Sequence, residues 1–282
     1  MTYNETQDFH VFCDASEIGF GGHLTIGSED EPVEIYGSWS REEQAQSSTW
    51  RELEAVNRIL RNVINKLNGK FVRVYTDNKN VTHIIRVGSR KNILHSGVME
   101  IHELCMKHSI KLSIAWIPRE ANDKADSLSR KSDCDDWEIE DWLFKYLDQL
   151  WGPHSVDRFA HDYNAKCKHF NSQFWCPGTN GIDSFTLSWY GKTNWLVPPP
   201  RLLTQVINKL EQEKCNGTLV VPEWTSAPFW PKIIDEHGQF RKFIIDHVYF
   251  QGDGLTKRGK GQNGIFGLQN LKFRLLALRV HF

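Results

Sequence analysis

The chain has 282 residues, a net charge of −1 and 24% charged residues. This length supports two hydrophobic cores, and the near-neutral charge excludes a protein that holds nucleic acid through overall basicity, so any positive contact surface must be local. No apolar stretch approaches the ~20 residues that span a bilayer, and the N-terminus is too polar for a signal peptide, so we expect an intracellular protein, nuclear or cytoplasmic, with no membrane partner.

The first 130 residues alternate strand-like and helix-like patterns. Strands are predicted within 8–40, at 70–78 and at 110–118, and helices at 47–69, 80–85, 96–108 and 121–131. In the long helix the apolar residues recur at helical spacing, from Leu53 to Leu67. The order βββαβαβα predicts an α/β domain over residues 8–131.

The second half of the chain begins with an acidic segment, 132–150, which is typical of a solvated linker or a helix start. Residues 151–250 alternate strand patterns with the amphipathic "RLLTQVINKLEQEK", which predicts a second, smaller α/β domain. Residues 251–282 are rich in glycine and then basic. We expect a tail there, for which nucleic-acid binding and a disordered end both stay open.

Four acids lie at similar places in these elements. Asp14 and Asp77 end predicted strands, Glu52 lies in the first turn of the long helix, and Asp126 lies in the short helix 121–131. On a helical wheel Glu52 is ~60° from the centre of the apolar stripe and leans toward the sheet, whereas Glu54, at ~140°, faces water. Each acid alone has an ordinary alternative role, as a turn former or a helix cap.

A cluster of four carboxylates would have a particular chemistry. The charges would repel and raise one another's pKa, so divalent cations would have to neutralise them. Oxygen-only ligands favour Mg²⁺ or Mn²⁺ over zinc. Two such ions ~4 Å apart can activate a water and stabilise the leaving oxygen in phosphodiester cleavage.

The segments "FCDAS", "TWRELEAV", "VYTDN" and "WIPREANDKADSLSR" resemble the ribonuclease H domain attached to reverse transcriptases of retroelements. The resemblance implies a ribonuclease H-like mixed sheet with flanking helices. It also implies hydrolysis of the RNA strand of RNA–DNA hybrids with two Mg²⁺ ions, Mn²⁺ being an alternative. The implied catalytic and metal-binding residues are Asp14, which bridges both ions, Glu52, Asp77 and Asp126.

Further residues are expected to hold the hybrid. Asn78 corresponds to the family's Asn after the third acid, and Ser16 follows the first acid closely. Arg86, Arg90 and Lys91 form a local basic patch that suits phosphate contact, with a solvated charged face as the ordinary alternative. Cellular ribonucleases H carry a His-containing loop before the last acid. This chain has the short form without it, which implies slower cleavage.

Downstream, the region from "HSVDRFAHDYNAKC" to "GTLVVPEW" resembles the segment after ribonuclease H in DIRS-type, tyrosine-recombinase retrotransposons. That segment is similar to phage-type DNA N6-adenine methyltransferases, which hold the target amine with an Asn/Asp-Pro-Pro-Tyr loop. This chain reads Val197-Pro198-Pro199-Pro200, in which Val has no side-chain acceptor and Pro stacks poorly on a base, so we expect a degenerate domain without methyl transfer. Asp157 and Asp183 are weak candidates for cofactor contacts.

These observations together predict a fragment of a retroelement polyprotein, without a polymerase upstream or a recombinase downstream. Two alternatives stay open, namely a non-catalytic nucleic-acid-binding remnant and an interaction scaffold built on the tryptophan-rich second half. The spacing of His161, Cys167, His169 and Cys176 disfavours a zinc site. The six cysteines include no CxxC pair, which is typical of free thiols.

Overall fold

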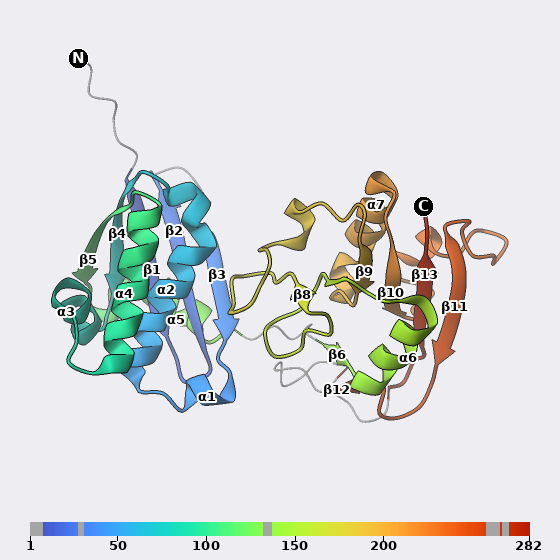
Figure 1. The fold of residues 1–282 in the computed structure, drawn as a ribbon, viewed down its shortest axis with the longest axis horizontal. Helices are drawn as coiled ribbons and strands as arrows, with labels where there is room; N and C mark the ends of the chain where they lie inside the picture. The colour runs from blue at the N-terminus through green and yellow to red at the C-terminus, as the bar shows by residue number, and fades with distance from the viewer. Residues whose placement is uncertain (1–7, 28–30, 132–136, 258–265, 267–270) are drawn as a thin grey trace, which may run out of the picture. The chain divides into compact units, whose positions relative to one another are not determined.

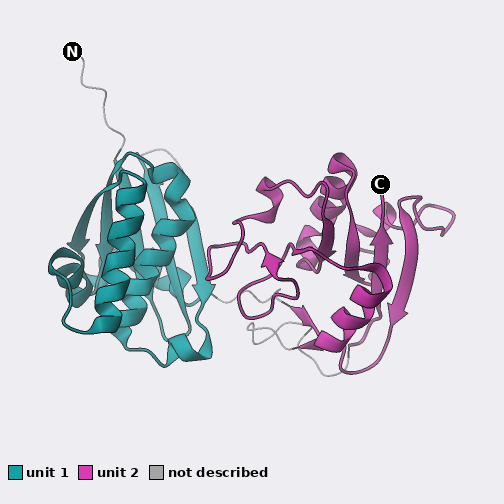
Figure 2. Ribbon diagram, viewed as in Figure 1, with its two compact units in different colours: residues 1–132 teal, residues 133–282 magenta. Residues whose placement is uncertain are grey.

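The computed structural model describes residues 8–27, 31–131, 137–257, 266 and 271–282 (Figure 1). The chain divides into two compact units, residues 1–132 and residues 133–282 (Figure 2). No helix in the described ranges combines the length and the apolar character needed to cross a bilayer.

A five-stranded mixed sheet lies at the centre of the first unit, in the order β3-β2-β1-β4-β5. Its strands are β1 (Phe9–Ala15), β2 (Gly19–Ile26), β3 (Val33–Ser38), β4 (Phe71–Thr76) and β5 (Lys111–Trp116). Strands β1, β4 and β5 run parallel, so their carboxyl ends share one edge of the sheet. Phe12 is in register with Tyr75, and two residues further along each strand the chain reaches Asp14 and Asp77.

The helices of the first unit cover both faces of this sheet (Figure 1). They are α1 (Arg41–Gln44), α2 (Ser48–Leu67), α3 (Lys79–Val87), α4 (Asn92–Lys107), the 3₁₀ turn η1 (Arg119–Ala121) and α5 (Asp123–Ser129). Successive residues of a strand point to opposite faces. A Cβ on Gly22 would meet Ile59 of α2, and a Cβ on Gly21 would lie 2.1 Å from the backbone nitrogen of Ser129 in α5. Helices α2 and α5 therefore lie on opposite faces, and Gly21 allows α5 its close approach.

The long helix α2 has the geometry that its sequence pattern predicts. Its N-cap is Ser47, whose hydroxyl accepts a hydrogen bond from the Trp50 N–H. The apolar stripe from Leu53 to Leu67 is buried, and Glu52 is buried with it at the edge of the stripe. The sequence predicts a helix at 96–108, whereas α4 begins earlier, at Asn92.

A six-stranded sheet forms the second unit, in the order β11-β13-β10-β9-β7-β8. The strands are β7 (Val156–Asp157), β8 (His169–Phe170), β9 (Thr193–Leu196), β10 (Asn216–Pro222), β11 (Ile244–Phe250) and β13 (Leu275–Val280), and a separate ribbon pairs β6 (Glu138–Ile139) with β12 (Thr256–Lys257). The helices are α6 (Asp141–Trp151) and α7 (Leu203–Glu213), with 3₁₀ turns η2 (Ser184–Thr186), η3 (Pro200–Leu202) and η4 (Trp230–Lys232). Leu219 and Val221 of β10 pack in the core that contains α7, whereas Val220 packs in the core that contains α6.

The segment 251–282 differs from the predicted tail. Its last strand, β13, lies inside the sheet and pairs antiparallel with both β10 and β11. Residues Leu275 to Leu278 are fully buried there. This strand contains the short apolar run "LLAL". The run is difficult to recognise as a strand from the sequence, because glycines and basic residues surround it. The second unit thus runs past residue 250. Of the expected acidic linker, residues 132–136 lie outside the described part, and residues 141–150 belong to α6.

Candidate active site

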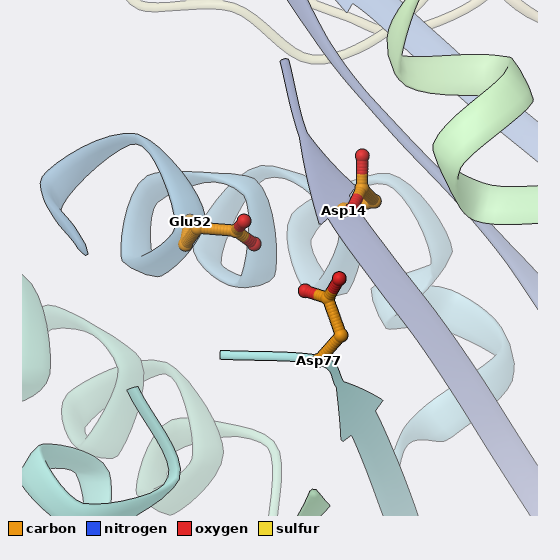
Figure 3. Close-up of side chains that lie close together, drawn as sticks. All are labelled: Asp14, Glu52 and Asp77. Atoms are coloured by element: carbon orange, nitrogen blue, oxygen red, sulfur yellow. The ribbon is translucent and has the colours of Figure 1, made fainter. Parts of the chain in front are cut away.

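Three carboxylates meet at the carboxyl edge of β1 and β4 (Figure 3). Asp14 lies near the end of β1, Asp77 directly follows β4, and Glu52 comes from the first half of α2. One oxygen from each carboxylate lies within 4.8 Å of the other two. Figure 3 shows the three side chains pointing toward one another from three separate elements. The convergence that the sequence predicts for these three acids is therefore present.

Burial makes this cluster electrostatically unfavourable in the absence of a cation. Glu52 is 8% exposed and Asp14 is 5% exposed. Desolvation raises the pKa of Glu52 to about 9, and the charges of Asp14 and Asp77 add to this rise. Burial also raises the pKa of Asp14, against a hydrogen bond from Ser129 that lowers it. The Oε2 atom of Glu52 is buried and has no hydrogen-bond partner among the described residues.

These features fit a hard divalent cation. The cluster offers only carboxylate oxygens, which suit Mg²⁺ or Mn²⁺, and an orphaned buried oxygen is the atom that a cation would satisfy. The three acids line an open hollow of about 520 Å³, together with Ser16 and Asp126. The hollow thus opens the carboxylates to solvent.

The fourth predicted acid, Asp126, lies beside the cluster in ion pairs of its own. It lines the same hollow but is not one of the three acids that meet within 4.8 Å among the described residues. Its Oδ1 accepts hydrogen bonds from Arg119 Nη2 at 2.7 Å and from Arg130 Nη2 at 2.6 Å. Three of the four predicted acids therefore converge, and the fourth is neutralised by two guanidinium groups next to them.

Two polar side chains tie α5, which carries Asp126, to the end of β1. Asn122 is at the N-cap position of α5, but it makes no capping bond within the described chain. Instead its buried Nδ2 donates to the Cys13 carbonyl at 3.0 Å. At the other end of α5 the Ser16 hydroxyl donates to the Ser129 carbonyl at 2.7 Å. These two bonds hold α5, which carries Asp126, against the end of β1, which carries Asp14.

The residues expected to touch nucleic acid are spread over the first unit. Ser16 lines the acid hollow. Asn78 caps α3, with Oδ1 accepting from the backbone of the next turn. Arg86 lines a different hollow beside α4 and β5, and it donates to the Ile114 carbonyl at 2.5 Å. Arg90 and Lys91 are exposed between α3 and α4. Their contacts with nucleic acid stay predictions.

The sequence reasoning missed several residues around the acids. Arg51, Arg119 and Arg130 line the hollow. The spacing of four between Asp126 and Arg130 was a usable signal, because residues at i and i+4 are neighbours on a helix. Trp116 lies beside the cluster, 43% exposed, and its Nε1 donates to the Asp77 carbonyl at 2.9 Å.

In the second unit the singled-out residues have structural partners. Asp157 is buried at the end of β7 and accepts backbone N–H groups. Asp183 caps η2 through a hydrogen bond from the Phe185 N–H. Val197 is buried and has no polar side-chain atom. The described His161, Cys167, His169 and Cys176 do not come together as a metal-binding set.

Comparison with known proteins agrees with this two-part organisation. Residues 4–103 match the family model of the RNase H-like domain found in reverse transcriptase. Residues 126–244 match the model of DNA N-6-adenine-methyltransferase (Dam). The chain thus joins an RNase H-like domain of the reverse-transcriptase type to a Dam-like domain, as the resemblances implied, while the DIRS-type origin stays a prediction. A search of curated proteins found no match.

Solved structures similar to this chain include several ribonucleases H. RNase H1 from the halophilic archaeon Halobacterium salinarum is 19% identical, over 43% of this chain and 93% of that chain, with a TM-score of 0.36. LC11-RNase H1, solved in complex with an RNA/DNA hybrid, is 19% identical over 43% and 93%, with a TM-score of 0.34. The prototype foamy virus protease-reverse transcriptase is 14% identical over 47% of this chain and 22% of that chain, with a TM-score of 0.35.

Proposed function

We propose that the first unit is a retroelement-derived ribonuclease H that hydrolyses the RNA strand of RNA–DNA hybrids by two-metal-ion catalysis. The observation that carries this proposal is the meeting of Asp14, Glu52 and Asp77 within 4.8 Å, with a buried Glu52 oxygen left without a partner among the described residues. A buried acid cluster of this kind is costly unless a cation neutralises it. The match to the RNase H-like family model supports the same chemistry.

In this proposal Asp14, Glu52 and Asp77 hold Mg²⁺ or Mn²⁺, and Asp126 is the fourth carboxylate of the shell. Cations bound there would supply Lewis-acid stabilisation of the phosphodiester and activation of a water nucleophile. The chain's own contribution is positional. Asn122 fixes α5 against β1, and the parallel register of β1 and β4 holds two of the acids side by side.

The surroundings of the acids suit a nucleic-acid substrate. Arg51, Arg119 and Arg130 supply positive charge at the rim of the hollow, where phosphates would approach. Trp116 presents an exposed ring next to Asp77, and the Lys79 ammonium lies 4.5 Å from the centroid of that ring. An aromatic face beside a cation is a sequence-tolerant surface for a sugar or base. The local positive charge explains how a chain of net charge −1 can hold a polyanion.

The test is a cleavage assay on an RNA–DNA hybrid with Mg²⁺, which compares the wild type with Asp77→Asn. Asp123→Asn is a matched control, because Asp123 is an exposed acid of the same unit. We expect the wild type and the control to cleave, and Asp77→Asn to lose at least about a hundredfold in rate. Equal background cleavage by all three proteins, with hybrid binding retained, would instead favour the non-catalytic remnant.

For the second unit we infer that methyl transfer is lost. The support is the loop Val197-Pro198-Pro199-Pro200, whose first residue has no side-chain acceptor for an adenine amine and whose last has no aromatic ring to stack on the base. The test is transfer of a labelled methyl group from S-adenosylmethionine to adenine-containing DNA. Incorporation above background would contradict this inference.

A further inference from the structure

The order in which successive strands join the sheet of the second unit reverses at β7. From β7 the chain adds β8 on one side and then β9 on the other, all three parallel. In open α/β sheets ligands bind beyond the carboxyl ends of the strands at such a switch point. Asp157 ends β7, and Val197 follows β9. The position between them is where a nucleotide-like methyl donor would bind in this unit.

The described residues leave almost no space at this position. The cavity measures about 10 Å³. That is roughly the room for one water molecule, whereas pockets for small ligands measure about 300–1,000 Å³. Its walls come from the ends of β7 and β9, from the ribbon strand β6, and from the chain between β7 and β8. The lining residues that matter here are Asp157, Lys166, Trp137, Glu138, Trp195 and Val197.

A cluster of ion pairs closes one side of the cavity. The Lys166 ammonium pairs with Glu138 Oε1 at 2.6 Å and with Asp141 Oδ1 at 2.5 Å. The Lys257 ammonium pairs with the same two acids, at 3.2 Å and 2.8 Å. Two cations and two anions therefore balance, and they join β6, α6 and β12 around the Lys166 side chain, which is only 7% exposed. Both lysines lower the pKa of Asp141, to about 2.

An aromatic wall closes another side. Trp137 stacks on Phe266 with ring centroids 4.3 Å apart. Its Nε1 donates to the Pro198 carbonyl at 3.0 Å, which holds the proline loop against this wall. Trp195 of β9 is fully buried in the same core. The loop and the wall therefore support each other, and the space that the described residues leave beside them is smaller than a base or a sugar.

The acid at the switch point is satisfied by the protein itself. Asp157 Oδ2 accepts the Lys166 N–H at 3.1 Å, and Oδ1 accepts the Phe159 N–H at 3.3 Å. Complete burial raises the pKa of Asp157 to about 6. Both oxygens of this cavity-lining carboxylate are thus engaged by backbone donors.

We propose that side chains of the protein itself occupy this crevice. The Lys166 side chain and its ion pairs with Glu138 and Asp141 fill it and fasten the β6–β12 ribbon onto the sheet, and the unit binds no S-adenosylmethionine or other nucleotide-sized ligand. This goes beyond the loss of methyl transfer, because it concerns binding of the donor and not only the handling of adenine. It does not depend on nuclease activity of the first unit.

The first experiment titrates the full chain with S-adenosylmethionine, S-adenosylhomocysteine and ATP, each to 1 mM, by calorimetry and by thermal unfolding. We expect no binding heat and no change in melting temperature. A ligand at about a hundred times its Kd would shift the melting temperature by several degrees. Saturable binding of any of the three compounds at one site per chain would overturn the proposal.

The second experiment tests the stabilising role of the Lys166 ion pairs. Lys166→Ala and Lys166→Met should each lower the melting temperature of the second unit by several degrees. The methionine variant should lose less, because it keeps the volume of the side chain. Lys168→Ala is the control, since Lys168 is exposed and two residues away. Unchanged melting of both Lys166 variants would contradict the proposal. If a variant fails to fold, the wild-type titration still decides whether the crevice binds a ligand.

Discussion

Replacing Glu52 by glutamine should separate the electrostatic cost of the acid cluster from its use in metal binding. Because burial and the neighbouring acids raise the pKa of Glu52 to about 9, the side chain is uncharged at pH 7 in the metal-free protein. Glutamine has nearly the same shape and is also uncharged. Below pH 4.5 without metal, where Glu52 is protonated in both the folded and the unfolded chain, the free energy of unfolding should therefore change by less than about 1 kcal/mol. At pH 7 Glu52→Gln should be the more stable protein by about 3 kcal/mol, because the unfolded wild type must take up a proton to fold.

The difference should appear as the pH rises. The folded-state pKa of Glu52 lies above its ordinary value of 4.5, so its contribution to stability is complete below pH 4.5 and is lost as the pH rises toward 9. Each pH unit in this window costs about 1.4 kcal/mol. Between pH 7 and pH 9 the wild type should therefore lose up to about 3 kcal/mol relative to Glu52→Gln.

Mg²⁺ binding, in contrast, should favour the wild type over Glu52→Gln. A carboxylic acid must lose its proton to bind a cation, so the Mg²⁺ affinity of the wild type should rise up to about tenfold per pH unit between pH 7 and pH 9. Mg²⁺ at a hundred times its Kd should stabilise the wild type by about 2.7 kcal/mol. Glu52→Gln should gain almost none of this, because glutamine brings no charge to the cation.

The assay is thermal unfolding of the first unit at pH 7, 8 and 9, with and without MgCl₂. Glu103→Gln, which removes an exposed acid on α4, is the control and should behave as the wild type. Equal stabilisation of Glu52→Gln and the wild type by Mg²⁺ would refute the reasoning. So would a wild-type stability that does not fall relative to the variant above pH 7.

Three further predictions concern the first unit. Burial lowers the pKa of His23 to about 4, below its ordinary value of 6.5, so stability should fall by up to about 2 kcal/mol between pH 7 and pH 5, and urea unfolding of His23→Phe should not show this loss. Gly21→Ala should destabilise the unit by about 1–3 kcal/mol in the same assay, because its Cβ would meet the backbone of α5. Trp116→Ala should raise the KM for hybrid about tenfold with little change in kcat, whereas Trp142→Ala in the second unit should leave KM unchanged.

Much of the acid site follows from local sequence patterns. The 20 residues of α2 give enough helical turns to orient Glu52 from its apolar stripe alone. Asp14 and Asp77 end strands that are parallel neighbours, and parallel strands bring their carboxyl ends to one edge. For these three acids the periodicity and the strand order together determine the meeting point.

Other features depend on contacts that spacing does not encode. Asp126 turns toward Arg119 and Arg130 because these long side chains reach it from either side, and the seven-residue helix α5 is too short for a wheel to show this. The Asn122 side chain bonds β1, 109 residues away in sequence. Strand β13 is recognisable only through its pairing with β10 and β11, which are distant in the chain. Such non-local partners are invisible to local patterns.

The most direct test of the central claim is to locate a cation among the three acids. Anomalous diffraction from crystals of the protein grown with Mn²⁺ would show its position. We expect a peak bound by oxygens of Asp14, Glu52 and Asp77 at distances of about 2.0–2.3 Å. A site without Mn²⁺ at saturating concentration, with the three carboxyl groups hydrogen-bonded to one another instead, would contradict it.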